Sequence, residues 1–256
     1  MTMQKEHNKK IVKVTLATFA MFACMLFMAN NYMYNNGLSG KYINTEPKEG
    51  QIKVACIGDS ITYGHGVADW TNNSYPVVLQ EILGEKYHVA NFGSSGACVN
   101  PDGDQPYIKR EIYQTALEYD ADIIIFMMGT NDAKPENWTN TNEFWTDYVE
   151  LLSSFCQGEK IPQIYVALCT EAYYTEKSDK STGLTSFDIQ PAIIDEIAET
   201  VSINAAQSSD LFMREIDIHA LSEIHPEWFE ADGIHPNNDG AKAIAELVAN
   251  TIQSEE

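Results

Sequence analysis

The stretch KVACIGDSIT at residues 53–62 decides the fold class, together with HVANFGSSG at 88–96 and IIIFMMGTND at 123–132. Each begins as a short apolar run that contains Val, Ile or Phe and then continues into turn residues such as Gly, Asp, Ser or Asn. Runs of this length that stop at turn residues are typical of buried β-strands. In each stretch the polar turn residues directly follow the strand. The sequence therefore predicts that the functional residues lie at the strand ends.

The same pattern continues along the chain, with longer amphipathic stretches between the apolar runs. Strands alternating with helices require right-handed crossovers, which place helices on both faces of a parallel sheet. We therefore expect an α/β fold. The expected strands are Lys53–Ile57, His88–Phe92, Ile123–Met128, Gln163–Leu168 and Leu211–Ile216. The expected helices are one that starts at Ser74-Tyr-Pro76, with Ser74 as N-cap, and Ile108–Tyr119, Asn142–Gln157, Ile189–Ser202 and Asn238–Ile252.

Length and charge limit the classes of function. With 256 residues, 44% of them hydrophobic, and no internal repeat, the chain has material for one sizeable core. Its formal net charge is -21. A surface this acidic repels phosphate backbones and anionic lipid headgroups, and no basic stripe with interleaved aromatics offsets the repulsion. The sequence therefore indicates that nucleic acid is not a partner.

The N-terminal part differs from the rest. Lysines precede the uncharged run Val14–Ala29, whose length lies between a signal-peptide core and a full bilayer span. We expect residues 1–29 to be a signal peptide or a signal-anchor helix, residues 30–50 a polar tether, and residues 51–256 the folded domain. Because positive flanks stay inside, the domain is expected on the outer face of the cytoplasmic membrane or secreted, with membrane contact through this segment alone.

No metal site is apparent in the sequence. The cysteines form no C-x-x-C spacing, and Asp102-Gly-Asp104 lacks the later ligands of a calcium loop. His219 is expected in an irregular stretch without metal-ligand company. The oxidation state of the cysteines after the apolar run stays open; they are Cys56, Cys98, Cys156 and Cys169.

Four strand-end or pre-helix loops together carry the residue types that acyl transfer needs. A serine hydroxyl such as that of Ser60 becomes nucleophilic when an imidazole takes its proton and a carboxylate holds the other ring nitrogen. His235 and Asp232 are spaced to do both. The developing oxyanion needs donors, for which the backbone N–H groups of Ser60 and Gly96 and the side-chain amide of Asn131 are suited.

These blocks resemble those of the SGNH/GDSL hydrolases: GDS-x-T, N-x-G-x-x-G, G-x-N-D and D-x-x-H-P, in that order. The resemblance extends from about Ile52 to the C-terminal helix. It implies Ser60 as nucleophile, Asp232 and His235 as its partners, and Gly96 and Asn131 as oxyanion donors. It also implies a three-layer α/β/α sandwich with a five-stranded parallel sheet in flavodoxin-like order, and no cofactor.

Other residues are expected to support this site. Gly58, Asp59 and Asp132 are expected to hold the motif loops, the aspartates through backbone hydrogen bonds. Aromatic residues in the intervening loops could form stacking walls for a sugar, although such residues equally often serve packing. The candidates for the substrate pocket are His65, Trp70, Tyr107 and Trp138.

The sequence thus predicts a serine esterase that hydrolyses small acyl esters, acetyl foremost, on small molecules or carbohydrate. An O-acyltransferase that passes the acyl group to a sugar hydroxyl would use the same acyl-serine step. A lipase or thioesterase is a further alternative, and a non-catalytic binding module is the least favoured. The substrate's acyl group and alcohol, and the oligomeric state, do not follow from the sequence.

Overall fold

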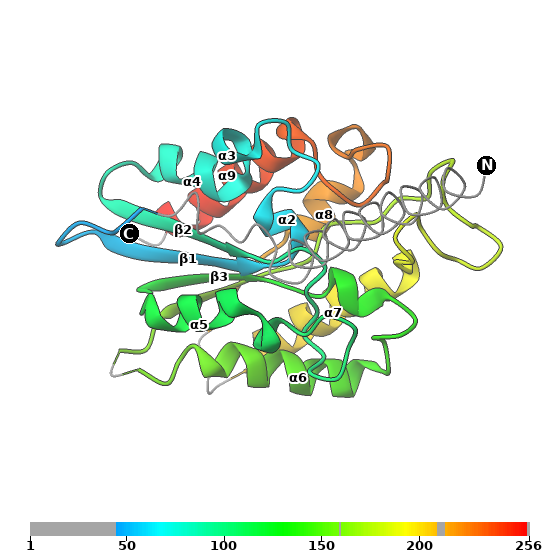
Figure 1. Ribbon diagram of the computed structural model, residues 1–256, viewed down its shortest axis with the longest axis horizontal. Coiled ribbons are helices and arrows are strands. Elements are labelled where there is room, and N and C mark those ends of the chain that lie inside the picture. Colours follow the sequence, from blue (N-terminus) through cyan, green and yellow to red (C-terminus); the bar gives the residue numbers. More distant parts are fainter. Residues whose placement is uncertain (1–44, 159, 209–212, 255–256) are drawn as a thin grey trace, which may run out of the picture. The chain divides into compact units, whose positions relative to one another are not determined.

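A five-stranded parallel sheet forms the centre of the computed structural model, which describes residues 45–158, 160–208 and 213–254 (Figure 1). The predicted strands are confirmed to within about a residue at each end, except that Leu211 lies outside the described residues. The strands are β1 Ile52–Gly58, β2 Tyr87–Gly93, β3 Ile123–Met127, β4 Gln163–Ala167 and β5 Met213–Ile216.

The strand order is β2-β1-β3-β4-β5, and every neighbouring pair is parallel. Since β1 pairs with both β2 and β3, the chain leaves β1 toward one edge and later returns to build the other. The order therefore reverses between β1 and β3. In open parallel sheets the carboxyl ends of the strands at such a reversal enclose the ligand crevice. This confirms the expected flavodoxin-like order and places the ends of β1 and β3 together.

Helices cover both faces of the sheet, as expected for a three-layer α/β/α arrangement (Figure 1). Helices α4 and α9 pack on one face, and α5, α6 and α7 lie on the other. The helices are α2 Ser60–Tyr63, α3 Trp70–Asn73, α4 Tyr75–Leu83, α5 Glu111–Glu118, α6 Thr141–Ser154, α7 Pro191–Gln207, α8 Ile218–Glu223 and α9 Asn238–Gln253. The 3₁₀ turns are η2 Tyr107–Lys109, η3 Thr130–Ala133 and η4 Pro226–Trp228.

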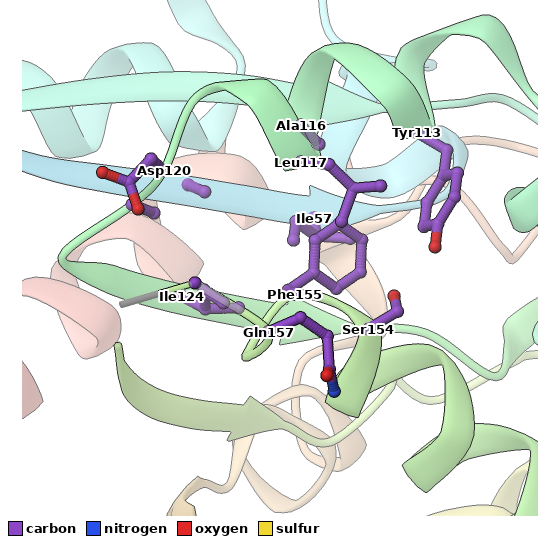
Figure 2. Close-up of a pocket in the computed structure, with 12 residues that line it drawn as sticks. Ile57, Tyr113, Ala116, Leu117, Asp120, Ile124, Ser154, Phe155 and Gln157 are labelled. Carbon is purple, nitrogen blue, oxygen red and sulfur yellow. The ribbon is translucent and has the colours of Figure 1, made fainter. Parts of the chain in front are cut away.

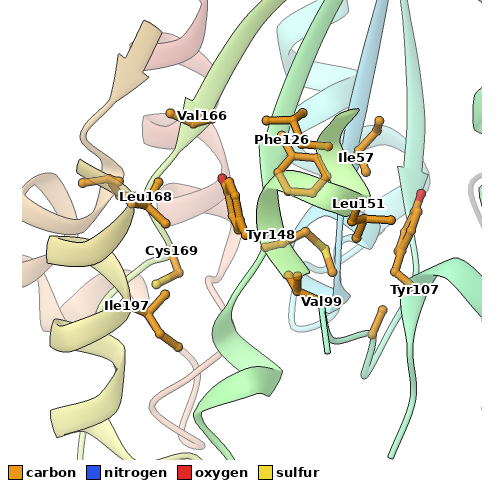
Figure 3. Close-up of a cluster of buried hydrophobic side chains, with 14 of the residues drawn as sticks. Ile57, Val99, Tyr107, Phe126, Tyr148, Leu151, Val166, Leu168, Cys169 and Ile197 are labelled. Atoms are coloured by element: carbon orange, nitrogen blue, oxygen red, sulfur yellow. The ribbon is translucent and has the colours of Figure 1, made fainter. Parts of the chain in front are cut away.

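The core divides between the two faces because successive strand side chains point in opposite directions. Val54 and Cys56 of β1 belong to the cluster under α4 and α9, whereas Ala55 and Ile57 belong to the cluster under α5, α6 and α7. Figure 3 shows the second cluster, in which the ring of Phe126 lies close to that of Tyr148. Both faces of β1 and β3 are buried over most of their length, which holds the strand ends of the crevice in place.

The predicted helix Ile108–Tyr119 was wrong at its start. Tyr107–Lys109 forms a 3₁₀ turn, Arg110 is extended with φ −85° and ψ 146°, and α5 begins only at Glu111. The buried Arg110 side chain donates a hydrogen bond to the side-chain oxygen of Gln105. The hydrophobic periodicity of the sequence does not reveal such a break. The break depends on which partner one buried polar side chain reaches in the folded chain.

The predicted N-terminal segment and most of the predicted tether lie outside the described residues. Within the described ranges, no helix combines the length and apolar character needed to cross a bilayer. The four described cysteines, Cys56, Cys98, Cys156 and Cys169, are all free thiols.

Candidate active site

The serine of the first motif lies at a sharp turn between β1 and α2. Asp59 caps the short helix by accepting a hydrogen bond from Ile61 N at 2.9 Å on its Oδ1. Gly58 has no room for a side chain, because a Cβ there would lie 2.1 Å from Thr62 Oγ1. Ser60 is thereby fixed as the first residue of α2, with 6% of its surface exposed.

Ser60, His235 and Asp232 form a hydrogen-bonded chain. His235 Nε2 lies 2.9 Å from Ser60 Oγ, although 175 residues separate the two, and His235 Nδ1 lies 2.9 Å from Asp232 Oδ2. The other oxygen, Asp232 Oδ1, accepts hydrogen bonds from the backbone N–H groups of Ile234 and His235 at 2.8 and 2.9 Å. The structure therefore brings together the three side chains that the motif analysis singled out.

The carboxylate of Asp232 sets the roles of the two ring nitrogens. Burial raises its pKa, but the side-chain and backbone hydrogen bonds from His235 and the one from Ile234 outweigh burial and lower the pKa to about 2. Asp232 is consequently ionised and acts as an acceptor at neutral pH. An acceptor at Nδ1 requires that nitrogen to carry hydrogen, which leaves Nε2 with the lone pair facing the Ser60 hydroxyl.

The donor groups expected around an oxyanion come from three separate turns. Gly96 has φ +78°, a left-handed conformation that glycine adopts readily. The side-chain amide of Asn131 lies 3.1 Å from Ala97 O and 3.4 Å from Asp59 Oδ2. The N–H of Ser60, at the first position of α2, has no partner inside the helix. The role of these groups as oxyanion donors remains a prediction.

Asp132 ties two of these turns together. Its carboxylate accepts hydrogen bonds from Val99 N at 2.9 and 3.0 Å and from Asn100 N at 3.0 Å. Burial raises its pKa to about 7, and burial likewise raises the pKa of Asp59. Both aspartates bind backbone N–H groups, as the sequence suggested for them, and the loop that contains Gly96 is thereby attached to the turn that contains Asn131.

The four residues proposed for the substrate pocket lie in different surroundings. The exposed ring of His65 packs against the His235 ring, with 4.2 Å between centroids. Trp70 stacks on Tyr63, and Trp138 packs on the core beside α6. The prediction for Tyr107 was wrong: it is completely buried and its hydroxyl donates to Phe92 O at 2.6 Å. The tyrosine joins the core because its hydroxyl reaches a buried acceptor. Assigning the residue to a loop from the sequence does not reveal that contact.

One aromatic residue beside the imidazole was missed. Phe187 is 44% exposed and approaches the His235 ring edge-on, with 5.2 Å between centroids. It is the last residue of the long loop 169–187, whose aromatic residues were visible in the sequence. Nothing in the sequence indicated which of those aromatics would reach the site.

The expectation for His219 was also wrong. The residue lies in α8 rather than in an irregular stretch, and its Nε2 faces carboxylate oxygens of Glu171 at 3.7 Å and Asp195 at 3.6 Å. These residues are 48 and 24 positions away in the chain. Spacing rules detect metal ligands that lie on one helix, strand or turn. They do not detect ligands on three elements that meet only in the folded chain.

A cavity of about 430 Å³ opens elsewhere, between α5 and the segment that follows α6 (Figure 2). The sheet residues Ile57 and Ile124 form part of its wall, and Leu117 and Phe155 line it from the helical layer. None of the residues discussed around Ser60 lines it, so it is separate from the candidate active site.

Several known proteins to which this chain is similar are esterases. An acetylxylan esterase from Xylanibacter ruminicola is 34% identical over 212 residues, which are 81% of this chain and 44% of that relative. A carbohydrate acetylesterase from Sinorhizobium meliloti superposes with a TM-score of 0.62 at 16% identity, over 80% of this chain and 100% of the other. A putative arylesterase from Agrobacterium tumefaciens gives 0.66 at 18%, over 80% and 99%.

The two structural likenesses concern the fold, and this chain spans less than half the length of the acetylxylan esterase. The family follows from a separate comparison. The model of the GDSL-like lipase/acylhydrolase family matches residues 56–243, which contain the Ser60 turn, the Gly96 and Asn131 turns and the Asp232–His235 pair. The chain therefore belongs to the GDSL-like lipase/acylhydrolase family, a family of serine ester hydrolases.

Proposed function

We propose that this chain removes small acyl groups, acetyl in particular, from hydroxyls of carbohydrate, with Ser60 as the nucleophile. The observation that carries the proposal is the pair of 2.9 Å hydrogen bonds that link Ser60 Oγ to His235 and His235 to Asp232. The choice of acetylated carbohydrate is supported by the 34% identical relative, which is an acetylxylan esterase.

In the first half of the reaction, Ser60 Oγ attacks the ester carbonyl carbon while His235 Nε2 takes the hydroxyl proton. The carbonyl oxygen becomes an oxyanion that the N–H groups of Ser60 and Gly96 and the Asn131 amide stabilise. The bond between Asn131 and Asp59 is long at 3.4 Å, so that amide hydrogen is the one that can turn toward the oxyanion at little cost. The protonated His235 then donates to the departing sugar oxygen.

The second half returns the enzyme to its starting state. Water attacks the acetyl-serine carbonyl as His235 takes its proton, and the intermediate releases acetate when the same proton returns to Ser60 Oγ. Asp232 stabilises the imidazolium in both halves because its carboxylate is ionised. No step needs a redox change or an additional reactant beyond water.

The full-length protein should release acetate from acetylated xylo-oligosaccharides and 4-nitrophenyl acetate. Activity should fall steeply as the acyl chain lengthens to octanoyl. Ser60→Ala should lose at least 10³-fold in kcat/KM, because the nucleophile is gone. Ser153→Ala, which changes a half-buried serine at the end of α6, serves as the matched control and should retain activity.

Product analysis decides among the alternatives. Equal rates on octanoyl and acetyl esters would replace the proposal with a lipase or thioesterase. Acetyl transfer to an added oligosaccharide in place of acetate release would replace it with an O-acyltransferase. Full activity in Ser60→Ala would overturn the nucleophile itself.

We further propose that the domain acts outside the cytoplasmic membrane, in line with the lysines that precede Val14–Ala29. A C-terminal alkaline phosphatase fusion, which is active only outside the membrane, should be active in intact cells. An inactive but stably produced fusion would contradict this location.

A further inference from the structure

Three side chains that could bind a metal ion converge near the start of the loop that follows β4. Glu171 lies in that loop, Asp195 in α7 and His219 in α8. One ligand atom from each lies within 4.8 Å of the other two. They come from three elements that no local turn could bring together, so their convergence is a feature of the tertiary fold.

The orientation of the His219 ring is set from outside this group. Its Nδ1 lies 3.2 Å from the backbone oxygen of Cys169, and a carbonyl can only accept, so Nδ1 carries hydrogen. In the neutral ring Nε2 then presents its lone pair to the carboxylates of Glu171 and Asp195. A lone pair facing two anionic oxygens is repelled unless a proton or a metal cation lies between them. Metal-bound histidines characteristically donate their second N–H to a backbone carbonyl in this way.

The separations favour a metal ion over a direct hydrogen bond. Nε2 is 3.7 Å from Glu171 Oε2 and 3.6 Å from Asp195 Oδ1, beyond the usual range of N–H···O bonds. Zinc bonds of about 2.0–2.2 Å at a tetrahedral angle place two ligand atoms about 3.3–3.6 Å apart. The two distances from His219 Nε2 therefore need to shorten by only a few tenths of an ångström for coordination, while the ligand atoms of all three residues already lie within 4.8 Å of one another.

The surroundings of Glu171 add to the case. Its Oε1 accepts from Ala172 N at 2.8 Å, which leaves Oε2 directed to the ring. The side chains of Glu171 and His219 are only 14% and 18% exposed, whereas that of Asp195 is 63% exposed, so an ion can arrive from solvent on the Asp195 side.

We propose that Glu171, Asp195 and His219 bind a divalent transition-metal ion of the Zn²⁺ type, with water as the fourth ligand. An imidazole with two carboxylates suits Zn²⁺, whereas Ca²⁺ and Mg²⁺ prefer oxygen ligands throughout. The ion plays a structural part, because its ligands are distinct from the Ser60, His235 and Asp232 group.

Such an ion would stabilise the loop that contacts the Asp232 turn of the candidate triad. Two residues beyond Glu171, Tyr173 N donates to Gly233 O at 2.8 Å, and Ser186 Oγ donates to Asp232 O at 3.2 Å. Joining the start of this loop to α7 and α8 restricts the segment that contacts the Asp232 turn. The inference does not depend on the proposed substrate.

The test begins with full-length protein freed of metal by a chelator and dialysis. Equilibrium dialysis against Zn²⁺, read by elemental analysis, should give one tightly bound ion per chain. Saturating Zn²⁺ should raise Tm by about 5 °C or more, as expected for a ligand present at a hundred times its Kd. Ca²⁺ and Mg²⁺ at the same concentration should produce a much smaller shift.

Matched variants separate this site from zinc bound loosely to an acidic surface. Asp195→Asn and His219→Gln should each weaken binding at least tenfold and abolish most of the Tm shift. The exposed Asp195 side chain makes the first variant safe for folding. His225→Gln is the control, because His225 also faces a carboxylate, that of Glu227 at 2.7 Å, yet outside this group. It should bind Zn²⁺ as the parent does.

The proposal is overturned by a stoichiometry well below one ion per chain, or by undiminished affinity in Asp195→Asn and His219→Gln. An equal loss in His225→Gln would also overturn it. The readouts are metal content and Tm, so the test gives a result even if the protein has no esterase activity. Conversely, a failure to bind zinc would not contradict the proposed hydrolysis.

Discussion

Burial raises the pKa of both Asp232 and Asp132, yet their hydrogen-bond partners leave the two carboxylates with very different pKa values. Asp232 keeps a pKa of about 2 because three hydrogen bonds, one from an imidazole and two from backbone N–H groups, outweigh burial. Asp132 is 1% exposed and receives backbone N–H groups only, with Asp59 as a further acidic neighbour, so its pKa rises to about 7. The first is suited to hold a charge beside His235, and the second to join loops.

Asp232→Asn tests the first of these roles at the level of one residue. We expect kcat to fall roughly 10³–10⁴-fold, because an amide no longer selects the Nδ1–H form of His235. The folded pKa of Asp232 lies below its ordinary value of 3.8, so its contribution to stability is complete above about pH 4 and is lost as pH falls through 2. The stability gap between parent and variant should therefore narrow in urea unfolding from pH 5 down to pH 2.

Asp120→Asn is the control for loss of a negative charge, since that side chain is 63% exposed and pairs with Lys53. A gap for Asp232→Asn that stays constant with pH, or equal kinetics for both variants, would contradict the role given to Asp232.

At the level of secondary structure elements, two helices begin with residues that are good N-caps by sequence yet differ in what they bind. Asn140 accepts hydrogen bonds from Asn142 N and Glu143 N, both at 3.0 Å, at the start of α6. Ser74 precedes α4 as expected, with Pro76 in the first turn, but its buried Oγ has no hydrogen-bond partner within the described residues. The rigid proline ring and the packing of α4 on the sheet therefore hold that helix start.

Replacing each cap by alanine should separate the two cases. Asn140→Ala should lower the free energy of unfolding by about 1 kcal/mol, the usual loss for a working N-cap. Ser74→Ala removes a buried hydroxyl without a partner, so the change should stay within about 0.5 kcal/mol or favour the variant. Chemical denaturation at neutral pH measures both; a larger loss in Ser74→Ala than in Asn140→Ala would contradict the interpretation.

At the level of the whole molecule, the formal net charge of -21 acts against the folded state. Like charges are closer together in the compact form than in the unfolded chain, and salt screens their repulsion with a Debye length of about 10 Å at 0.1 M. Exposed ion pairs such as Lys242 with Glu246 at 3.7 Å contribute little attraction, so screening them costs little.

Raising NaCl from about 10 mM to about 0.3 M should therefore raise Tm by a few degrees, because screening relieves more repulsion than attraction. Differential scanning calorimetry in a metal-free buffer measures the shift, and KCl should reproduce it if the effect is one of ionic strength. A Tm that falls with salt would mean that the ion pairs dominate instead.

Much of the fold and the candidate site could be predicted because the relevant information is local. Apolar runs such as Ile123–Met127 and the turn residues after them depend on neighbours a few positions away, so strand positions, motif order and family could be inferred. The membership of Ser60, His235 and Asp232 in one group followed from the chemistry that such residues share.

Which side chains meet across the chain followed from the folded structure and not from local sequence. The burial of Tyr107, the contact of Phe187 with His235 and the convergence of Glu171, Asp195 and His219 all depend on how crossovers of a parallel sheet are packed. Residues 24 or 48 positions apart become neighbours through that packing, and no local period or spacing records it. Local sequence therefore fixed the strands and the turn that contains the candidate nucleophile, whereas the packing of the folded chain fixed what surrounds them.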